Sequence, residues 1–236
     1  LLKNFSDEDV IVKVIKEDTT LKNINKRDLN NLVLSLVSII KKKTINKLGN
    51  KIKIMGIIKA SEESLLMMLA SAWLGAEHSI CFEDLSESAI QTRMEMFNPD
   101  VILCRKSFEC SFLNNFPLLI NKKSSLIIID LEKLENECSK NLNLMGKSEK
   151  YSSDSSLFTL YTSGSTGNPK AITHEAKRYF EYAKMSTKTF FGLNKSSIIF
   201  TATDAGWING HTYAVYGPLA CGSTIVICED LKKLSD

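Results

Sequence analysis

Little in this sequence indicates a metal site, a membrane span or a nucleic-acid surface. It has only three histidines, and none of its six cysteines forms a Cys-x-x-Cys pair, so we expect no zinc or other metal site. No apolar run approaches the roughly 20 residues that a spanning helix needs, and no signal-peptide pattern is visible. A net charge of +3, from 30 basic and 27 acidic residues, is too small to indicate a nucleic-acid or membrane partner.

What remains is the composition of an ordinary globular protein. Hydrophobic residues make up 44% and charged residues 24% of 236 positions, enough for one large domain or two small ones. Cys81, Cys104, Cys221 and Cys228 lie in apolar runs, where cysteine usually acts as a small buried hydrophobe. We therefore expect reduced thiols and a cytoplasmic protein.

The spacing of apolar residues predicts helices alternating with strands. Residues 27–43 repeat apolar side chains every three or four positions, as an amphipathic helix does. Ser61 is expected to be the N-cap of a helix with two glutamates in its first turn, a buried run at 65–74 and Gly75 as its end. Further helices are predicted at 86–97 and 174–191, and strands at 51–58, 78–82, 101–104, 126–129, 157–160, 198–201 and 224–228.

This alternation indicates an α/β fold. Strands that are apolar throughout favour mainly parallel sheets covered by helices on both faces. Residues 132–156 are polar and are expected to form a surface connection. The helix at 174–191 is expected to bury one stripe, made of Ala176, Tyr179, Phe180, Ala183, Thr187 and Phe190.

The most distinctive segment is Tyr161-Thr-Ser-Gly-Ser-Thr-Gly-Asn-Pro-Lys170, which follows a predicted strand. Glycines let the backbone take positive φ and approach a ligand closely. Successive N–H groups can then surround an anion, and hydroxyl and ammonium groups add donors. The segment therefore predicts a polyphosphate-binding loop, followed by a helix that starts near Ala171.

Two other interpretations of this loop were weighed. A polar surface loop would explain the glycines and hydroxyls, but not their ordered arrangement between a strand and a helix. A Walker loop needs Gly-Lys followed by Ser or Thr, whereas Pro169-Lys170-Ala171 stands here, and proline offers no N–H.

A second segment, Thr203-Asp-Ala-Gly-Trp-Ile-Asn-Gly-His-Thr-Tyr213, follows the predicted strand at 198–201. Taken alone, it is a glycine-containing turn in which Trp207 is a core anchor and His211 a satisfied polar residue.

Together the two segments resemble the adenylate-forming (AMP-binding) superfamily. The string 162–170 is similar to its phosphate-binding signature, and 203–224 resembles the acyl-pocket segment of short-chain acyl-CoA synthetases, acetyl-CoA synthetases first and propionyl-CoA synthetases second. The resemblance implies ATP-dependent activation of a short carboxylic acid through an acyl-adenylate, then transfer to CoA. The implied substrates are the acid, ATP with Mg²⁺, and CoA.

The resemblance also implies roles for individual residues. Lys170 would be the catalytic residue, a point charge for the leaving pyrophosphate, and the helix after the loop would add its dipole. Trp207, Ile208 and Asn209 would form the acyl pocket beside CoA. The ATP phosphates would be held by Lys170 together with Thr162, Ser163, Gly164, Ser165, Thr166 and Gly167.

The sequence departs from the family pattern in places. Ala171 replaces a usual glycine, Asn209 a usual threonine, and Arg105-Lys106-Ser107-Phe108 stands near where an Arg-Gly-Gly run would contact CoA. Residues 1–236 are expected to be an incomplete N-terminal AMP-binding domain without the C-terminal domain, inactive alone. The alternative from another class is a non-catalytic nucleotide- or partner-binding domain.

Overall fold

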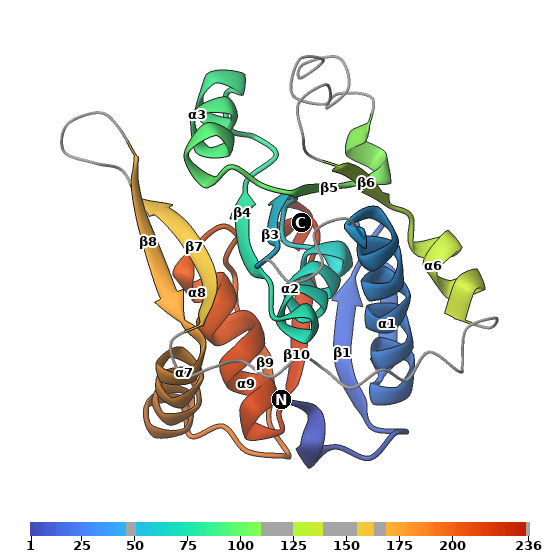
Figure 1. Ribbon diagram of the computed structural model, residues 1–236. Coiled ribbons are helices and arrows are strands. Elements are labelled where there is room, and N and C mark those ends of the chain that lie inside the picture. The colour runs from blue at the N-terminus through green and yellow to red at the C-terminus, as the bar shows by residue number, and fades with distance from the viewer. Residues whose placement is uncertain (46–50, 110–124, 139–154, 163–168, 235–236) are drawn as a thin grey trace.

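The computed structural model describes residues 1–45, 51–109, 125–138, 155–162 and 169–234, with only the backbone described for 137, 138 and 234. Figure 1 shows two sheets with helices packed around them. The six-stranded sheet has the order β6 (Ser125–Ile129), β5 (Val101–Arg105), β3 (Lys53–Ile57), β4 (Glu77–Cys81), β7 (Ser156–Thr162), β8 (Lys170–Glu175). The four-stranded sheet has the order β2 (Leu21–Asn25), β1 (Val10–Ile15), β10 (Thr224–Cys228), β9 (Ile198–Phe200).

Neighbouring strands are parallel except for β1–β2 and β7–β8, which are antiparallel. The predicted α/β class with mainly parallel sheets is therefore confirmed. The α-helices are α1 (Lys26–Lys43), α2 (Glu62–Leu74), α3 (Glu87–Phe97), α6 (Leu131–Cys138), α7 (Ala176–Phe191), α8 (Ile208–His211) and α9 (Gly217–Cys221). Short 3-10 turns are η1 (Leu2–Asn4), η3 (Lys106–Phe108) and η5 (Leu231–Leu234), and η4 (Thr212–Tyr216) is a π-helical turn.

Helix α2 lies in the middle of the molecule, between β3 and β4 on one side and β1 and β10 on the other (Figure 1). This position explains why its sequence is apolar all round, since both of its sides face a sheet. Ser61 caps it through the backbone N–H of Ser64, and Gly75 ends it with φ +66°, as predicted.

The six-stranded sheet is covered on both faces. Ile54 and Leu103 belong to the core that contains α1 and α2, whereas Met55 and Cys104 pack with α3 on the opposite face. The alternation follows from the two-residue period of a strand. Because β3 and β5 are buried on both faces, neither strand has a polar side, which is the pattern seen in the sequence, whereas β8 at the edge is mostly exposed.

Several expectations need correction. Residues 131–138 of the expected surface connection form helix α6, and 139–154 lie outside the described residues. Strands β1 and β2 were not predicted. Phe190 is 69% exposed rather than buried in the α7 stripe, and Cys221 is half-buried, unlike the buried Cys81, Cys104 and Cys228.

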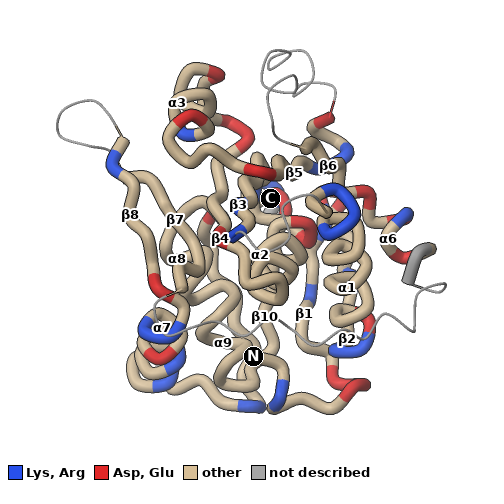
Figure 2. Tube along the Cα trace, viewed as in Figure 1, with Lys and Arg blue, Asp and Glu red and all other residues tan. Residues whose placement is uncertain are grey.

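Basic and acidic residues are interspersed along the described chain, as the small net charge suggests (Figure 2). None of the described helices is long and apolar enough to cross a membrane. Among the same residues, no group of three or more His, Cys, Asp or Glu side chains is placed to hold a metal ion.

Candidate functional site

The predicted phosphate loop joins the two strands of the β7–β8 hairpin. Thr162 and Lys170 are cross-strand partners at its outer end, and both are exposed. Figure 1 shows the hairpin reaching outward beyond the helices around it. The intervening candidates lie outside the described residues: Ser163, Gly164, Ser165, Thr166 and Gly167.

The helix expected near Ala171 is not there. Residues 170–175 form strand β8, and the first helix after the loop, α7, begins at Ala176. The segment Ala171-Ile172-Thr173 pairs with β7 in antiparallel register, which gives its backbone hydrogen bonds without a helix. The α7 N-terminus therefore stands a six-residue strand, about 20 Å, from Lys170, too far for its dipole to act there.

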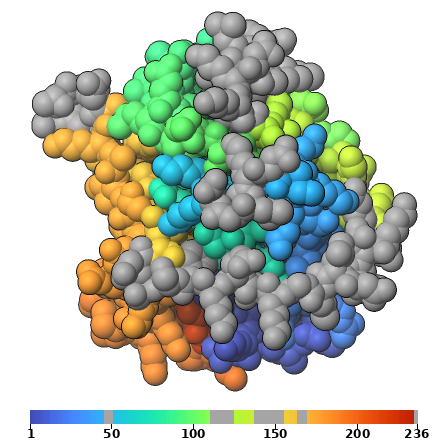
Figure 3. All heavy atoms as spheres, viewed as in Figure 1, coloured from blue at the N-terminus to red at the C-terminus, as the bar shows by residue number. Residues whose placement is uncertain are grey.

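The base of the hairpin is fixed firmly. Phe158 is fully buried, and the Thr159 hydroxyl donates to Glu77 Oε1 at 2.6 Å. Near the tip, the Tyr161 hydroxyl donates to the Arg93 carbonyl at 3.4 Å, and the Arg93 guanidinium lies 5.8 Å from the Tyr161 ring centroid. In the space-filling view the hairpin (yellow to orange) lies directly against α3 (green), which holds its direction (Figure 3).

The second predicted segment is a tight turn that leads into α8. Asp204 Oδ1 accepts from the backbone N–H of Gly206 at 3.0 Å, and burial raises the pKa of the Asp204 carboxyl. A Cβ on Gly206 would lie 2.5 Å from the Phe82 ring, and one on Gly210 would lie 2.2 Å from the Asp204 carbonyl oxygen. Both positions therefore need glycine for close approach.

The turn presents its three predicted pocket residues to the outside. Trp207 is 59% exposed and packs against Phe82, with ring centroids 5.7 Å apart. Ile208 and Asn209 are also exposed. Trp207 is thus a surface feature and not a core anchor.

The turn and the loop lie at the same end of the six-stranded sheet. His78 of β4 and Phe158 of β7 are parallel partners, and both strands run on from there in the same direction. Phe82, which Trp207 contacts, follows β4, and the loop follows Thr162 at the end of β7. Ligands of open α/β sheets bind at this carboxyl end of the strands.

Beneath the turn, two histidines meet in the core. His78 and His211 are both fully buried, and their Nε2 atoms lie 3.2 Å apart. Burial lowers the pKa of both rings, that of His211 to about 4. The sequence did not reveal this pairing, because His78 and His211 lie 133 residues apart.

Arg105 lies near the residues expected to contact CoA, but its side chain forms ion pairs with other residues of the chain. Its Nε and Nη2 atoms donate to the two carboxylate oxygens of Glu83 at 2.6 and 2.7 Å, and Nη1 donates to Glu17 at 3.3 Å. These pairs raise the pKa of the guanidinium. Arg105 is therefore a structural cation.

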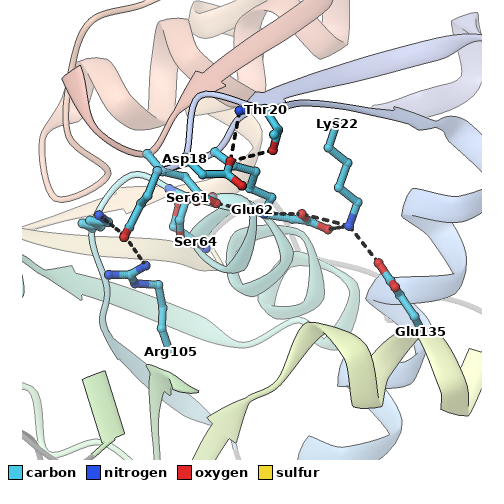
Figure 4. Close-up of polar contacts among 12 residues, drawn as sticks. Asp18, Thr20, Lys22, Ser61, Glu62, Ser64, Arg105 and Glu135 are labelled. Atoms are coloured by element: carbon cyan, nitrogen blue, oxygen red, sulfur yellow. Dashed lines mark hydrogen bonds and ion pairs between the residues drawn. The ribbon is translucent and has the colours of Figure 1, made fainter. Parts of the chain in front are cut away.

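A second ion-pair group joins the four-stranded sheet to helices α2 and α6. The Glu62 carboxylate is fully buried and accepts from Lys16 and Lys22, each at 2.9 Å. Figure 4 shows Glu62 of α2 directed toward Lys22 of β2, which also reaches Glu135 of α6. Glu62 lies in the first turn of α2, as predicted, and it also forms a buried ion-pair link to β2 and α6.

Comparison with known proteins gives one family. The AMP-binding enzyme family matches residues 21–236. Acetyl-coenzyme A synthetase of Helicobacter pylori (strain P12) is 31% identical over 198 residues, which are 74% of this chain and 30% of that protein. Acetyl-coenzyme A synthetase 1 of Debaryomyces hansenii is 33% identical over 192 residues, covering 71% and 28% respectively.

A solved structure has the same fold. The crystal structure of Brucella canis acyl-CoA synthetase matches with a TM-score of 0.78 and 17% identity, over 95% of this chain and 41% of that one. The chain spans about a third of the length of the curated relatives it matches.

Proposed function

This chain belongs to the AMP-binding enzyme family, and on that premise we propose that the protein containing it is an acetyl-CoA synthetase, an AMP-forming acid–thiol ligase. A carboxylate oxygen of acetate attacks the α-phosphorus of ATP, and the bond to the β-phosphate breaks as pyrophosphate leaves. The CoA thiol then attacks the acyl carbon, loses its proton, and AMP leaves. The observation that carries the proposal is the exposed Trp207 turn at the same sheet end as the phosphate loop.

In this proposal the hairpin loop holds MgATP. Residues 162–167 surround the β- and γ-phosphates with N–H and hydroxyl donors, and Lys170 neutralises charge on the leaving pyrophosphate. Such a reaction depends on positioning and charge neutralisation more than on a protein nucleophile. Pairing of Lys170 with Thr162 supports this role, because it keeps the backbone of Lys170 beside the start of the loop.

Trp207 closes the acyl pocket, with Ile208 and Asn209 beside it. A pocket that the short acyl group already fills discriminates against longer acids by about 1–3 kcal/mol of binding free energy for each added methylene. The choice of acetate is supported by the acetyl-coenzyme A synthetases among the relatives. Propionate is the competing substrate, and a comparison of kcat/KM for the two acids decides between them.

The test is acetate-dependent exchange of pyrophosphate into ATP by the full-length protein containing this chain. Lys170→Ala is expected to slow exchange about 100-fold, the lower range for losing one charge-stabilising group. Lys177→Ala, which removes an exposed lysine of α7, is the matched control. Equal rates for the two variants would refute the role of Lys170.

A non-catalytic nucleotide-binding domain makes a different prediction. It would bind MgATP with micromolar affinity as the 236-residue chain alone, without supporting exchange in any longer protein. Calorimetric titration of the chain with MgATP, beside the exchange assay, separates the two functions.

A further inference from the structure

The two buried histidines form a hydrogen bond in the plane of their rings. The planes of His78 and His211 differ by 10°, and the ring centroids are 5.3 Å apart while the Nε2 atoms are only 3.2 Å apart. The rings therefore meet edge to edge, with one nitrogen directed at the other. Phe158 encloses the pair, 4.3 Å from the His211 ring and 5.5 Å from the His78 ring, measured between centroids.

Which ring donates this hydrogen bond follows from the contact between His211 and the Trp207 carbonyl. His211 Nδ1 lies 3.2 Å from the Trp207 carbonyl oxygen, which can only accept, so Nδ1 must hold the hydrogen. A neutral imidazole has one N–H, which leaves His211 Nε2 as an acceptor and makes His78 Nε2 the donor. Burial keeps both rings neutral at pH 7 by lowering their pKa values.

From this arrangement we infer that His78 and His211 are positioning residues, a relay that ties the Trp207 carbonyl to strand β4 and so fixes the acyl end of the site. The role in catalysis rests on the proposed function. The Trp207 side chain is 59% exposed, so packing against Phe82 holds it only in part. Its carbonyl also accepts from the N–H groups of Gly210 at 3.0 Å and His211 at 3.4 Å, and the imidazole bond fixes that carbonyl relative to the sheet.

The first experiment observes the relay in the 236-residue chain. Long-range ¹H–¹⁵N spectra distinguish the imidazole tautomers, and three single-histidine variants assign the three histidines. We expect Nδ1–H for His211, Nε2–H for His78, and no titration of either ring between pH 6 and 8. Two Nε2–H tautomers, or an ordinary titration of either ring, would overturn the relay.

The second experiment tests what the relay does in the full-length protein. His211→Asn keeps a donor near the Nδ1 position but loses the acceptor for His78, whereas His211→Gln places its amide near Nε2 and loses the donor to Trp207, so each variant breaks the relay at one end. We expect both variants to raise KM for the acid about fivefold to tenfold, the effect of one hydrogen bond, with kcat and KM for ATP little changed. His174→Gln, which changes a half-buried histidine beside Phe158, should stay near wild type.

A KM for the acid that stays at the wild-type value in either His211 variant would refute the positioning role. Failure of the wild type to exchange pyrophosphate with any short acid would refute the proposed function instead. Acrylamide quenching would then test positioning, in a Trp73→Phe chain where Trp207 is the remaining tryptophan. Quenching must rise in both His211 variants and not in His174→Gln, and quenching at the wild-type level in either His211 variant rejects the inference.

Discussion

Replacing Arg105 with methionine should destabilise the protein severely, because Arg105 and Glu83 form a buried bidentate pair. The two side chains are each 9% exposed, so Glu83 would remain as a buried carboxylate without its cation. Removing one member of such a pair costs about 3–5 kcal/mol. The further contact with Glu17 adds less than about 1 kcal/mol, since Glu17 is 49% exposed.

The loss should also depend on pH. Burial raises the pKa of Glu63, and the nearby Arg105 charge opposes that rise. Without Arg105 the folded-state pKa of Glu63 rises further, so the folded protein binds more protons than the unfolded chain and loses stability as pH increases through that pKa. The difference in unfolding free energy between Arg105→Met and wild type should therefore be largest at pH 7–8 and shrink toward pH 4.

Urea unfolding of the 236-residue chain, followed by circular dichroism, measures this difference. Lys106→Met is the control, since it removes the next residue's 2.7 Å ion pair with Asp130, in which Lys106 is 62% exposed. Such surface pairs contribute about 0.2–1 kcal/mol. The reasoning fails if the two variants unfold at the same urea concentration, or if Arg105→Met/Glu83→Gln is no more stable than Arg105→Met alone.

Two further predictions concern packing and burial. Gly217→Ala should cost at least about 1–3 kcal/mol in thermal unfolding, because its Cβ would lie 2.0 Å from Thr187 Oγ1 and 2.6 Å from the Thr212 carbonyl oxygen. Gly192→Ala, at φ +64° with no atom within 4 Å, should cost only about 1–2 kcal/mol, and an equal loss in both would contradict the packing argument. Glu63→Gln should unfold at a higher temperature than wild type at pH 8 and at the same temperature as wild type at pH 4. Burial raises the pKa of Glu63, so its ionisation opposes folding as pH rises. A gain in stability that persists at pH 4 would show that burial of the charge is not its cause.

Local signals were sufficient for much of the fold. The Ser61 cap, the Gly75 terminus and the all-apolar run between them define α2 and its burial without any tertiary information. Parallel strands such as β5 and β10 were predictable because burial on both faces favours short runs of apolar residues.

Features that depend on distant residues could not be predicted in this way. The burial of Glu62 depends on Lys16, which follows β1, and on Lys22 of β2, and the sequence did not reveal either strand. Strand β8 is mostly exposed, so no apolar run marks it, and only its pairing with β7 distinguishes it from the first turn of α7. For the candidate site, the residue types indicated the chemistry, while the hairpin geometry and the histidine relay arise from packing.

The pairing of β1 with β10 has a consequence for how the chain folds. These strands lie near opposite ends of the chain, yet they are parallel neighbours at the centre of their sheet. During synthesis β1 emerges early and has only β2 as a neighbour until residues 224–228 leave the ribosome. The six-stranded sheet can assemble first, and the four-stranded sheet closes last and slowly, because its central contact is so distant in sequence. A version shortened past Ile15 would leave β10 with an open edge, and aggregation rather than local fraying is the expected result.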